Sequence, residues 1–391
     1  MPASGTESRS SVTSSPDGMR RWTGSADTVP ARTTTFTVTM TPPSATDVSS
    51  RVRHTPPCET RIVDEQDFEM APVASGITVI DTGMAGQREL NAVYLVAAGE
   101  PALVETGPGA DGPVVLRSLE RLGVGADDLA HIVVTHIHVD HAGGAGALLA
   151  RFPRATLWVH EIGAPHLLDP ARLVASTARI YGAERMRAFY GETLPVPADR
   201  IRPMSGGDRV GLGDRSLQVL HTPGHATHHV SMLDDATGAM FTGESIGSHL
   251  PWADSYRPAL PPPEVDVEAA LDSIHRMALT RPSVLLTSHF GPVVDPDDGF
   301  SRAAERIRSW SETVRRELEG RPERDADDVV PLLTDQAREE YERDSGLPFD
   351  LSRYDAIGSI RMNTQGLARY WRKRWEREAG EAPRPPIAQA R

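Results

Sequence analysis

One short stretch of the chain gathers metal-ligating side chains more densely than folding alone requires. Directly after the apolar run 132–134, residues 135–141 read Thr-His-Ile-His-Val-Asp-His, so three imidazoles and a carboxylate fall within six positions. Neutral imidazole nitrogen and carboxylate oxygen are the ligands that zinc takes when no thiolate is offered. The small residues 142–146 allow a helix to begin close to such a site. The stretch therefore predicts a site for a pair of divalent metal ions.

Length and charge restrict the classes of function that fit this site. A chain of 391 residues suggests one large domain or two ordinary ones. The net charge is −13, from 54 acidic and 41 basic residues, which argues against nucleic acid as the main partner because phosphate contacts need clustered Lys and Arg. No apolar run is long enough to span a membrane, and the single cysteine, Cys58, cannot form an internal disulfide. We expect a cytoplasmic protein with a small-molecule substrate; the sequence leaves its oligomeric state open.

The composition changes along the chain and suggests domain boundaries. Residues 1–70 are rich in Ser, Thr, Pro and Arg, and we expect a disordered extension because such a segment cannot offset its ordering entropy. A catalytic domain is expected over 71–296, followed by a helical extension over 297–378 and a tail over 379–391. Apolar residues at helical spacing predict the helices of the extension near 298–320, 326–345 and 351–376. Its basic, aromatic end, 370–375, is expected to pack as an amphipathic helix rather than to bind nucleic acid or a membrane surface.

Strand and helix patterns within 71–296 predict the fold class. Short runs rich in β-branched and aromatic residues predict two series of strands. The first series lies at 77–80, 92–96, 102–105 and 132–135, and the second at 156–159, 217–220, 230–233, 239–242 and 284–287. A helix near 112–123 and a helical insertion over 161–192, which would cap the pocket, lie between strands. This order predicts a four-layer α/β sandwich with a metal site between its halves.

Further metal-ligating groups recur where later strands end. His225 follows Thr-Pro-Gly, Glu244 follows Phe-Thr-Gly, and His289 lies in Thr-Ser-His-Phe-Gly. Small turn residues permit a close approach of the backbone, and loops that leave strand ends favour ligand sites. Each predicted strand therefore delivers a polar group to one edge of the sheets.

The order and spacing of these elements resemble the metallo-β-lactamase superfamily over residues 76–295. The resemblance implies an αββα sandwich, here with a C-terminal helical extension. It implies two divalent metal ions, zinc in the first place and manganese or iron as alternatives. The implied ligands of the first metal are His136, His138 and His225, those of the second are Asp140, His141 and His289, and Glu244 bridges the two together with a water or hydroxide.

Two positions depart from the pattern of this superfamily. Glu244 stands where the family usually has aspartate, and its extra methylene moves the carboxylate by about one bond length, against zinc–oxygen distances that vary by only a few tenths of an ångström. Glu105 stands where an aspartate usually supports the site from behind, a position that tolerates a longer side chain better. His229 and His249 are further candidates for supporting the site or contacting the substrate.

The resemblance implies a hydrolase. A hydroxide generated at the metal pair would attack the carbonyl carbon of a small ester, lactone or thioester, with Asp140 orienting it and taking its proton. Glyoxalase II-like thioesterases and lactonases resemble this core, but the Gly-Cys-Gly-Arg type segment of glyoxalase II relatives is absent from 245–251, which weakens a glutathione thioester assignment. The alternatives are a mononuclear-iron redox enzyme, similar to persulfide dioxygenases, and a degenerate, non-catalytic metal-binding member of the superfamily.

Overall fold

The computed structural model describes residues 69–356 and 358–381, so the predictions about the N-terminal extension and Cys58 lie outside the described residues. A seven-stranded sheet runs in chain order from β1 to β7. Its strands are β1 (Met70–Ala74), β2 (Ile77–Asp81), β3 (Ala92–Val96), β4 (Ala102–Val104), β5 (His131–Val133), β6 (Thr156–His160) and β7 (Ile201–Met204). Neighbours from β1 to β4 are antiparallel and those from β4 to β7 are parallel. The parallel part therefore has its carboxyl ends at one edge.

A five-stranded sheet faces the first, in the order β14-β11-β10-β9-β8. Its strands are β8 (Arg209–Gly211), β9 (Ser216–His221), β10 (Val230–Asp234), β11 (Ala239–Gly243) and β14 (Val284–Thr287). The strands β11 and β14 are parallel. A separate hairpin joins β12 (Ser248–Leu250) to β13 (Ser255–Arg257).

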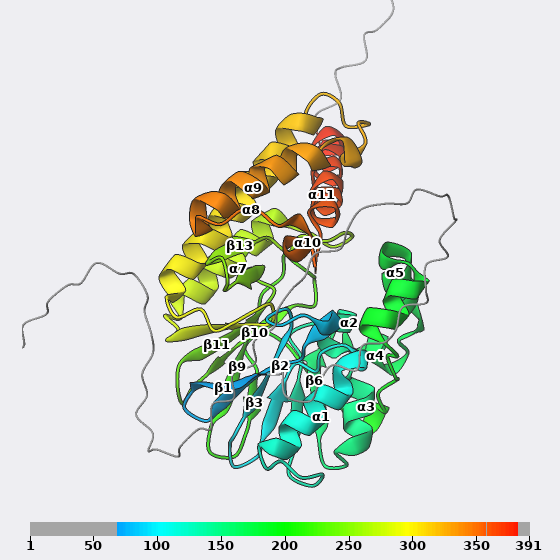
Figure 1. The fold of residues 1–391 in the computed structure, drawn as a ribbon. Coiled ribbons are helices and arrows are strands. Elements are labelled where there is room, and N and C mark those ends of the chain that lie inside the picture. Colours follow the sequence, from blue (N-terminus) through cyan, green and yellow to red (C-terminus); the bar gives the residue numbers. More distant parts are fainter. Residues whose placement is uncertain (1–68, 357, 382–391) are drawn as a thin grey trace, which may run out of the picture. The chain divides into compact units, whose positions relative to one another are not determined.

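The strands β3, β4, β11 and β14 in these sheets are buried along their whole length. Successive side chains of a strand point to opposite sides, so both faces of the sheets are covered there. In β5, Ile132 packs under helices α1 (Gly112–Arg121) and α3 (Ala145–Arg151), whereas Val133 faces the second sheet. In β11, Met240 packs under α7 (Val267–Leu279) and α8 (Pro296–Leu318), whereas Phe241 faces the first sheet. Figure 1 shows these helices on the outer faces of the two sheets. The predicted four-layer αββα sandwich is confirmed.

Short helices complete this part of the chain. The segment between β6 and β7 contains α4 (Ala164–Leu168), α5 (Ala171–Tyr181), α6 (Ala183–Arg185) and a π-helical turn η3 (Met186–Tyr190). Val139 of α2 (Val139–Ala142) packs in one apolar cluster with Met186 and Tyr190. The remaining short turns are η1 (Met84–Gly86), η2 (Gly109–Asp111), η4 (Ala198–Arg200) and η5 (Ala326–Asp328). Helix α5 and the turn η3 thus lie against α2, the helix that contains the last residues of the His-rich stretch.

The C-terminal extension differs in one respect from its predicted course. After α8 come α9 (Val330–Ser345), α10 (Leu351–Tyr354) and α11 (Ile360–Glu381), so the single helix predicted over 351–376 is interrupted. Gly358 adopts a left-handed φ of 63°, and the Asp355 carboxylate accepts a hydrogen bond of 3.0 Å from the Ile360 amide, which starts a new helix. Helix α11 also continues three residues into the predicted tail.

The basic, aromatic end of α11 packs inward. Tyr370 is buried, and the indole N–H of Trp371 donates to the Ser311 carbonyl of α8 at 3.1 Å. None of the helices within the described ranges is both long and apolar enough to cross a membrane. The stretch therefore packs onto the second sheet's helices, which accords with an amphipathic packing helix.

One buried acid in the fold should give the stability a pH dependence. Asp111 precedes α1, and its Oδ2 accepts a hydrogen bond of 2.7 Å from the Thr82 hydroxyl. Burial raises the pKa of Asp111 to about 7 from an ordinary value of 3.8. The folded chain therefore binds a proton that the unfolded chain lacks between these two values, and the free energy of unfolding falls as pH rises through this window.

Asp111→Asn should remove this dependence, because the amide resembles the protonated acid. Relative to wild type, the variant should gain about 2–4 kcal/mol of stability between pH 4.5 and pH 7.5. Urea unfolding of both proteins at fixed metal content measures the difference, with Asp127→Asn, at an exposed position, as control. If the free energies of unfolding of wild type and Asp111→Asn changed with pH in parallel, the raised pKa of Asp111 would be contradicted.

Candidate metal centre

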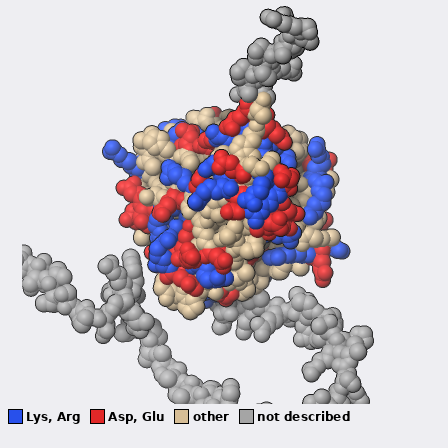
Figure 2. All heavy atoms as spheres, turned by 90° about the horizontal axis from the view of Figure 1, so that it is seen from above, with Lys and Arg blue, Asp and Glu red and all other residues tan. Residues whose placement is uncertain are grey.

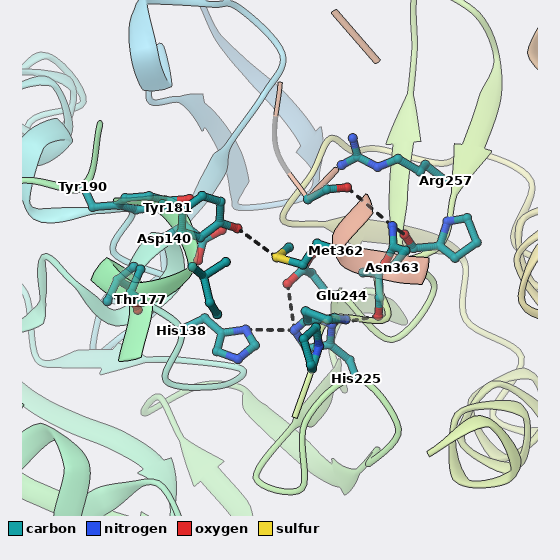
Figure 3. Close-up of a pocket in the computed structure, with 17 residues that line it drawn as sticks. His138, Asp140, Thr177, Tyr181, Tyr190, His225, Glu244, Arg257, Met362 and Asn363 are labelled. Carbon is teal, nitrogen blue, oxygen red and sulfur yellow. Dashed lines mark hydrogen bonds and ion pairs between the residues drawn. The ribbon is translucent and has the colours of Figure 1, made fainter. Parts of the chain in front are cut away.

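The predicted ligands meet where strands of both sheets end. His136 and His138 lie in the loop after β5, and Asp140 and His141 lie in α2, which begins directly after that loop. His225 follows β9, whereas Glu244 and His289 follow the parallel strands β11 and β14. Figure 3 shows His138, Asp140, His225 and Glu244 turned toward a common space.

A first group of four ligand-type atoms fits around one ion. His138 Nδ1 lies 3.0 Å from His136 Nε2 and 2.9 Å from His225 Nε2. Glu244 Oε2 lies 2.9 Å from His225 Nε2 and 3.4 Å from His136 Nε2. Tetrahedral zinc with bonds of about 2.0 Å separates its ligand atoms by about 3.3 Å. These spacings are those of atoms that share one cation.

A second group lies beside the first. His141 Nε2 is 3.1 Å from His289 Nε2, and Asp140 Oδ2 is 3.8 Å and 3.6 Å from the same two nitrogens. Glu244 reaches this group as well, with Oε2 3.4 Å from His141 Nε2 and Oε1 3.8 Å from His289 Nε2. The longer acid at position 244 thus lies between the two groups, as a bridging carboxylate must.

The second nitrogens of the imidazoles fix their orientation. His225 Nδ1 lies 2.9 Å from the Ala259 carbonyl oxygen, and His289 Nδ1 lies 2.7 Å from the Leu90 carbonyl oxygen. A ring N–H that donates to a carbonyl leaves the lone pair of the other nitrogen free for a metal. Both rings are therefore held in the tautomer that a ligand needs.

Glu105 lies behind the second group. Its Oε1 accepts hydrogen bonds from the hydroxyls of Thr135, at 2.5 Å, and Ser288, at 3.0 Å, and lies 3.4 Å from His141 Nδ1. The side chain is almost completely buried. It therefore occupies the supporting place that the sequence predicts for it, and it links the ligand loops of both sheets.

The structure places the two remaining candidate histidines away from the ligand groups' open side. His229 Nε2 accepts the backbone N–H of Glu244 at 3.1 Å, so its ring holds the backbone of that residue. His249 donates its backbone N–H to the His289 carbonyl at 2.6 Å, and its Nδ1 lies 3.0 Å from the Phe290 carbonyl oxygen. It lines a separate small pocket with His289 and Trp252.

Gly243 is required where the chain passes His229. Its φ is 54°, and a Cβ added there would lie 2.5 Å from His229 Nε2 and 2.6 Å from Thr135 Oγ1. A larger residue would displace one of these side chains or the turn itself. The glycine before Glu244 thus determines how closely this loop approaches the loop after β5.

The electrostatics of the cluster favour a cation. Burial lowers the pKa of His136 well below its ordinary value and that of His138 to about 3, so both rings are neutral. Burial would also lower the pKa of His141, but the charges of Asp140 and Glu105 raise it well above the ordinary value. Burial would raise the pKa of Glu244, but His225 and other histidine partners hold it well below its ordinary value. Carboxylates that stabilise a positive charge on imidazole also stabilise a metal cation.

A pocket opens over this centre, and three segments far apart in the sequence form its walls. Thr177, Ile180 and Tyr181 come from α5, and Met362 and Asn363 come from α11. Arg257, at the end of β13, and the prolines that follow it also line the pocket. The first of these walls, α5, lies in the segment 161–192 that was expected to cap the pocket. The contributions of α11 and Arg257 were missed, because nothing in their local sequence marks a ligand site.

Comparison with known proteins identifies the family. The family model of the metallo-beta-lactamase superfamily matches residues 85–289, and the chain belongs to this superfamily. The fold of the superfamily implies that the cluster binds divalent metal. The predicted family resemblance is thus confirmed.

Individual relatives cover different shares of the chain. The metallo-beta-lactamase fold-containing protein ST1585 of Sulfurisphaera tokodaii is 27% identical over 221 residues, which are 56% of this chain and 79% of that protein. A hydroxyacylglutathione hydrolase of Hahella chejuensis is 34% identical over 143 residues, 36% of this chain but only 41% of the hydrolase. The metallo-beta-lactamase family protein TTHA1429 of Thermus thermophilus shares the fold, with a TM-score of 0.54 at 19% identity over 78% of this chain and 95% of that one.

Removal of one imidazole should empty the first group. His138→Ala takes away the Nδ1 that lies between His136 and His225, so the variant should bind about one zinc ion fewer per chain than wild type after loading and gel filtration. Elemental analysis measures the content. His275→Ala, on the exposed side of α7, is the matched control and should bind as much zinc as wild type. Full zinc content in His138→Ala would contradict the ligand assignment.

Proposed function

We propose that this protein is a metal-dependent hydrolase that cleaves a small ester, lactone or thioester with two divalent metal ions, zinc in the first place. One observation carries the proposal: Glu244 lies between two groups of buried ligand atoms at the floor of a pocket. His136, His138 and His225 would hold one ion, and Asp140, His141 and His289 the other. The chemistry that such ions supply is a lowered pKa of water and polarisation of a carbonyl oxygen.

Asp140 is the residue to which we assign proton transfer. It lines the pocket, and its Oδ2 lies 3.6 Å from His289 Nε2. Burial would raise the pKa of Asp140, but His141 and His289 beside it lower that pKa to about 2. The carboxylate therefore stays ionised, so it can orient a water molecule and accept its proton.

Tyr181 offers a proton donor in the wall of the same pocket. Its hydroxyl lies 3.5 Å from the Met362 sulfur and lines the same pocket. Burial, with the charge of Asp140 as a smaller contribution, raises the pKa of Tyr181 to about 12. The hydroxyl therefore stays protonated and can donate to a carbonyl or a leaving group within the pocket.

The walls favour a small organic substrate over a polymer. Apolar surface of Ile180, Pro258 and Met362 surrounds the approach to the ligands, as in pockets that enclose small molecules. On the face shown in Figure 2, Lys and Arg side chains alternate with Asp and Glu among the described residues and form no broad basic field there. The hydroxyacylglutathione hydrolase relative supports an ester-type bond by its name, over the matched part of the chain.

Metal analysis combined with a substrate panel tests the proposal. The purified protein should contain two zinc ions per chain and should hydrolyse lactones, thioesters or aryl esters. Asp140→Asn should lower kcat by about 10²–10⁴-fold, because the amide cannot accept a proton. The unsubstituted protein stripped of metal is the parallel negative control. A single iron per chain with oxygen consumption would contradict the proposal in favour of a redox enzyme, and full metal loading without turnover would point to a binding protein.

A further inference from the structure

Arg257 is a buried cation in the wall of the pocket. Its residue is only 2% exposed. One terminal nitrogen donates to the Tyr354 carbonyl, and the other donates to the Ser248 hydroxyl at 3.1 Å. The Nε has no hydrogen-bond partner, and among the described residues no carboxylate lies within 4.0 Å of the guanidinium. The charge is thus removed from water without an opposite charge beside it.

Such an arrangement is costly unless something else meets the charge. Burial of an unpaired ion is strongly unfavourable, and folded proteins accordingly pair nearly all buried charges. Asp355, which follows Tyr354, acts on the charge of Arg257 from beyond that distance, and its Oδ1 accepts the amide N–H of Ile360 at the start of α11. The two acceptors that Arg257 does have, a carbonyl and a hydroxyl, are neutral and do not require a permanent cation. The guanidinium carbon also lies 5.6 Å from the centre of the Tyr354 ring, which attracts the cation, but this contact supplies no acceptor for the Nε–H.

We propose that Arg257 binds a carboxylate carried by the substrate, so that the acyl substrates of this enzyme have a negatively charged end. This inference rests on the proposed hydrolase function. The Nε–H and the free N–H of a terminal nitrogen form a fork that matches the two oxygens of a carboxylate. Arg257 is the sole Lys or Arg among the residues that line this pocket in the described chain. One cation balances a carboxylate better than a phosphate monoester, which carries nearly two charges.

The rest of the pocket defines what connects the carboxylate to the scissile bond. Figure 3 shows Arg257 around one pocket with Tyr181, Met362 and four of the candidate ligands, namely His138, Asp140, His225 and Glu244. These two side chains touch through the tyrosine hydroxyl and the methionine sulfur. A short apolar chain would contact them while the scissile carbonyl reaches the metal centre. The substrate class is therefore a half-ester or half-thioester of a dicarboxylic acid, or a lactone that bears a carboxylate.

Bound metal ions would attract an anion as well, so the experiment must separate their field from that of Arg257. Thioesters of succinic, glutaric and adipic acid are compared with thioesters of the same leaving group whose free carboxylate is replaced by the isosteric amide. With zinc-loaded wild type, the acid of the best chain length should have kcat/KM about tenfold or more above its amide. Arg257→Gln should reduce this preference to roughly twofold or less, mainly through KM for the acid.

Two further variants control for structure. Arg257→Lys keeps the charge but loses the fork, so it should retain part of the preference. Ser248→Ala removes a hydrogen-bond partner of the guanidinium but no charge, and should keep the full preference. Zinc content and thermal stability are measured for each variant. If Arg257→Gln does not fold, Arg257→Lys tests the proposal instead, and a rise in KM for the acid without a change in KM for the amide would support it. A preference that is the same in wild type and in the tested Arg257 variant would overturn the proposal.

A binding measurement distinguishes failure of this inference from failure of the hydrolase proposal. Calorimetric titration of zinc-loaded and metal-free protein compares 4-phenylbutyrate with 4-phenylbutyramide, neither of which is hydrolysed. Tighter binding of the acid by about tenfold, lost in Arg257→Gln, supports the carboxylate site even if no thioester turns over. Equal binding of acid and amide by wild type overturns it even if the neutral thioesters are hydrolysed, and so does an acid preference that persists in Arg257→Gln.

Discussion

The candidate metal centre depends on one buried carboxylate, that of Glu105. Its Oε1 accepts hydrogen bonds from Thr135, at the end of the first sheet's β5, and from Ser288, after the second sheet's β14. A carboxylate removed from water needs such donors to replace its hydration. Because the same oxygen faces His141 Nδ1, one group fixes the distance between the sheets and the orientation of a candidate ligand. The loops that carry His136 and His289 are thus joined through one side chain.

The parts of the site that were predictable from the sequence are those that local signals specify. His136, His225 and His289 each follow a strand, and a strand leaves its next residues at the edge of its sheet whatever the rest of the fold does. The parallel strands β4 to β7 and β11 with β14 then bring these edges together, as two series of strands with helices between them require. The directions in which the His229 and His249 side chains point were not predictable in this way, because they depend on how the turns around Gly243 and Phe290 pack.

The pocket walls were less accessible to sequence reasoning, since distant segments form them. Helical spacing continues through 351–376, but Gly358 and Asp355 interrupt it, and the new helix brings Asn363 against the loop after β13. The Asn363 side chain accepts the Leu260 amide N–H at 2.6 Å and donates to the Pro258 carbonyl at 2.9 Å. More than a hundred positions separate these partners, and no periodic pattern records such a pairing. The C-terminal extension thus completes the pocket as well as covering the second sheet.

The backbone at Glu244 is held in place by two contacts. His229 Nε2 accepts its amide N–H, and the left-handed Gly243 turn, which has no room for a Cβ, fixes where its Cα lies. From there the longer side chain places Oε2 within 3.4 Å of nitrogens from both ligand groups. An aspartate on the same backbone would withdraw the carboxylate by about 1.5 Å, the length of one carbon–carbon bond. The turn at Gly243 therefore sets the position from which the longer glutamate side chain, in place of the usual aspartate, reaches atoms of both ligand groups.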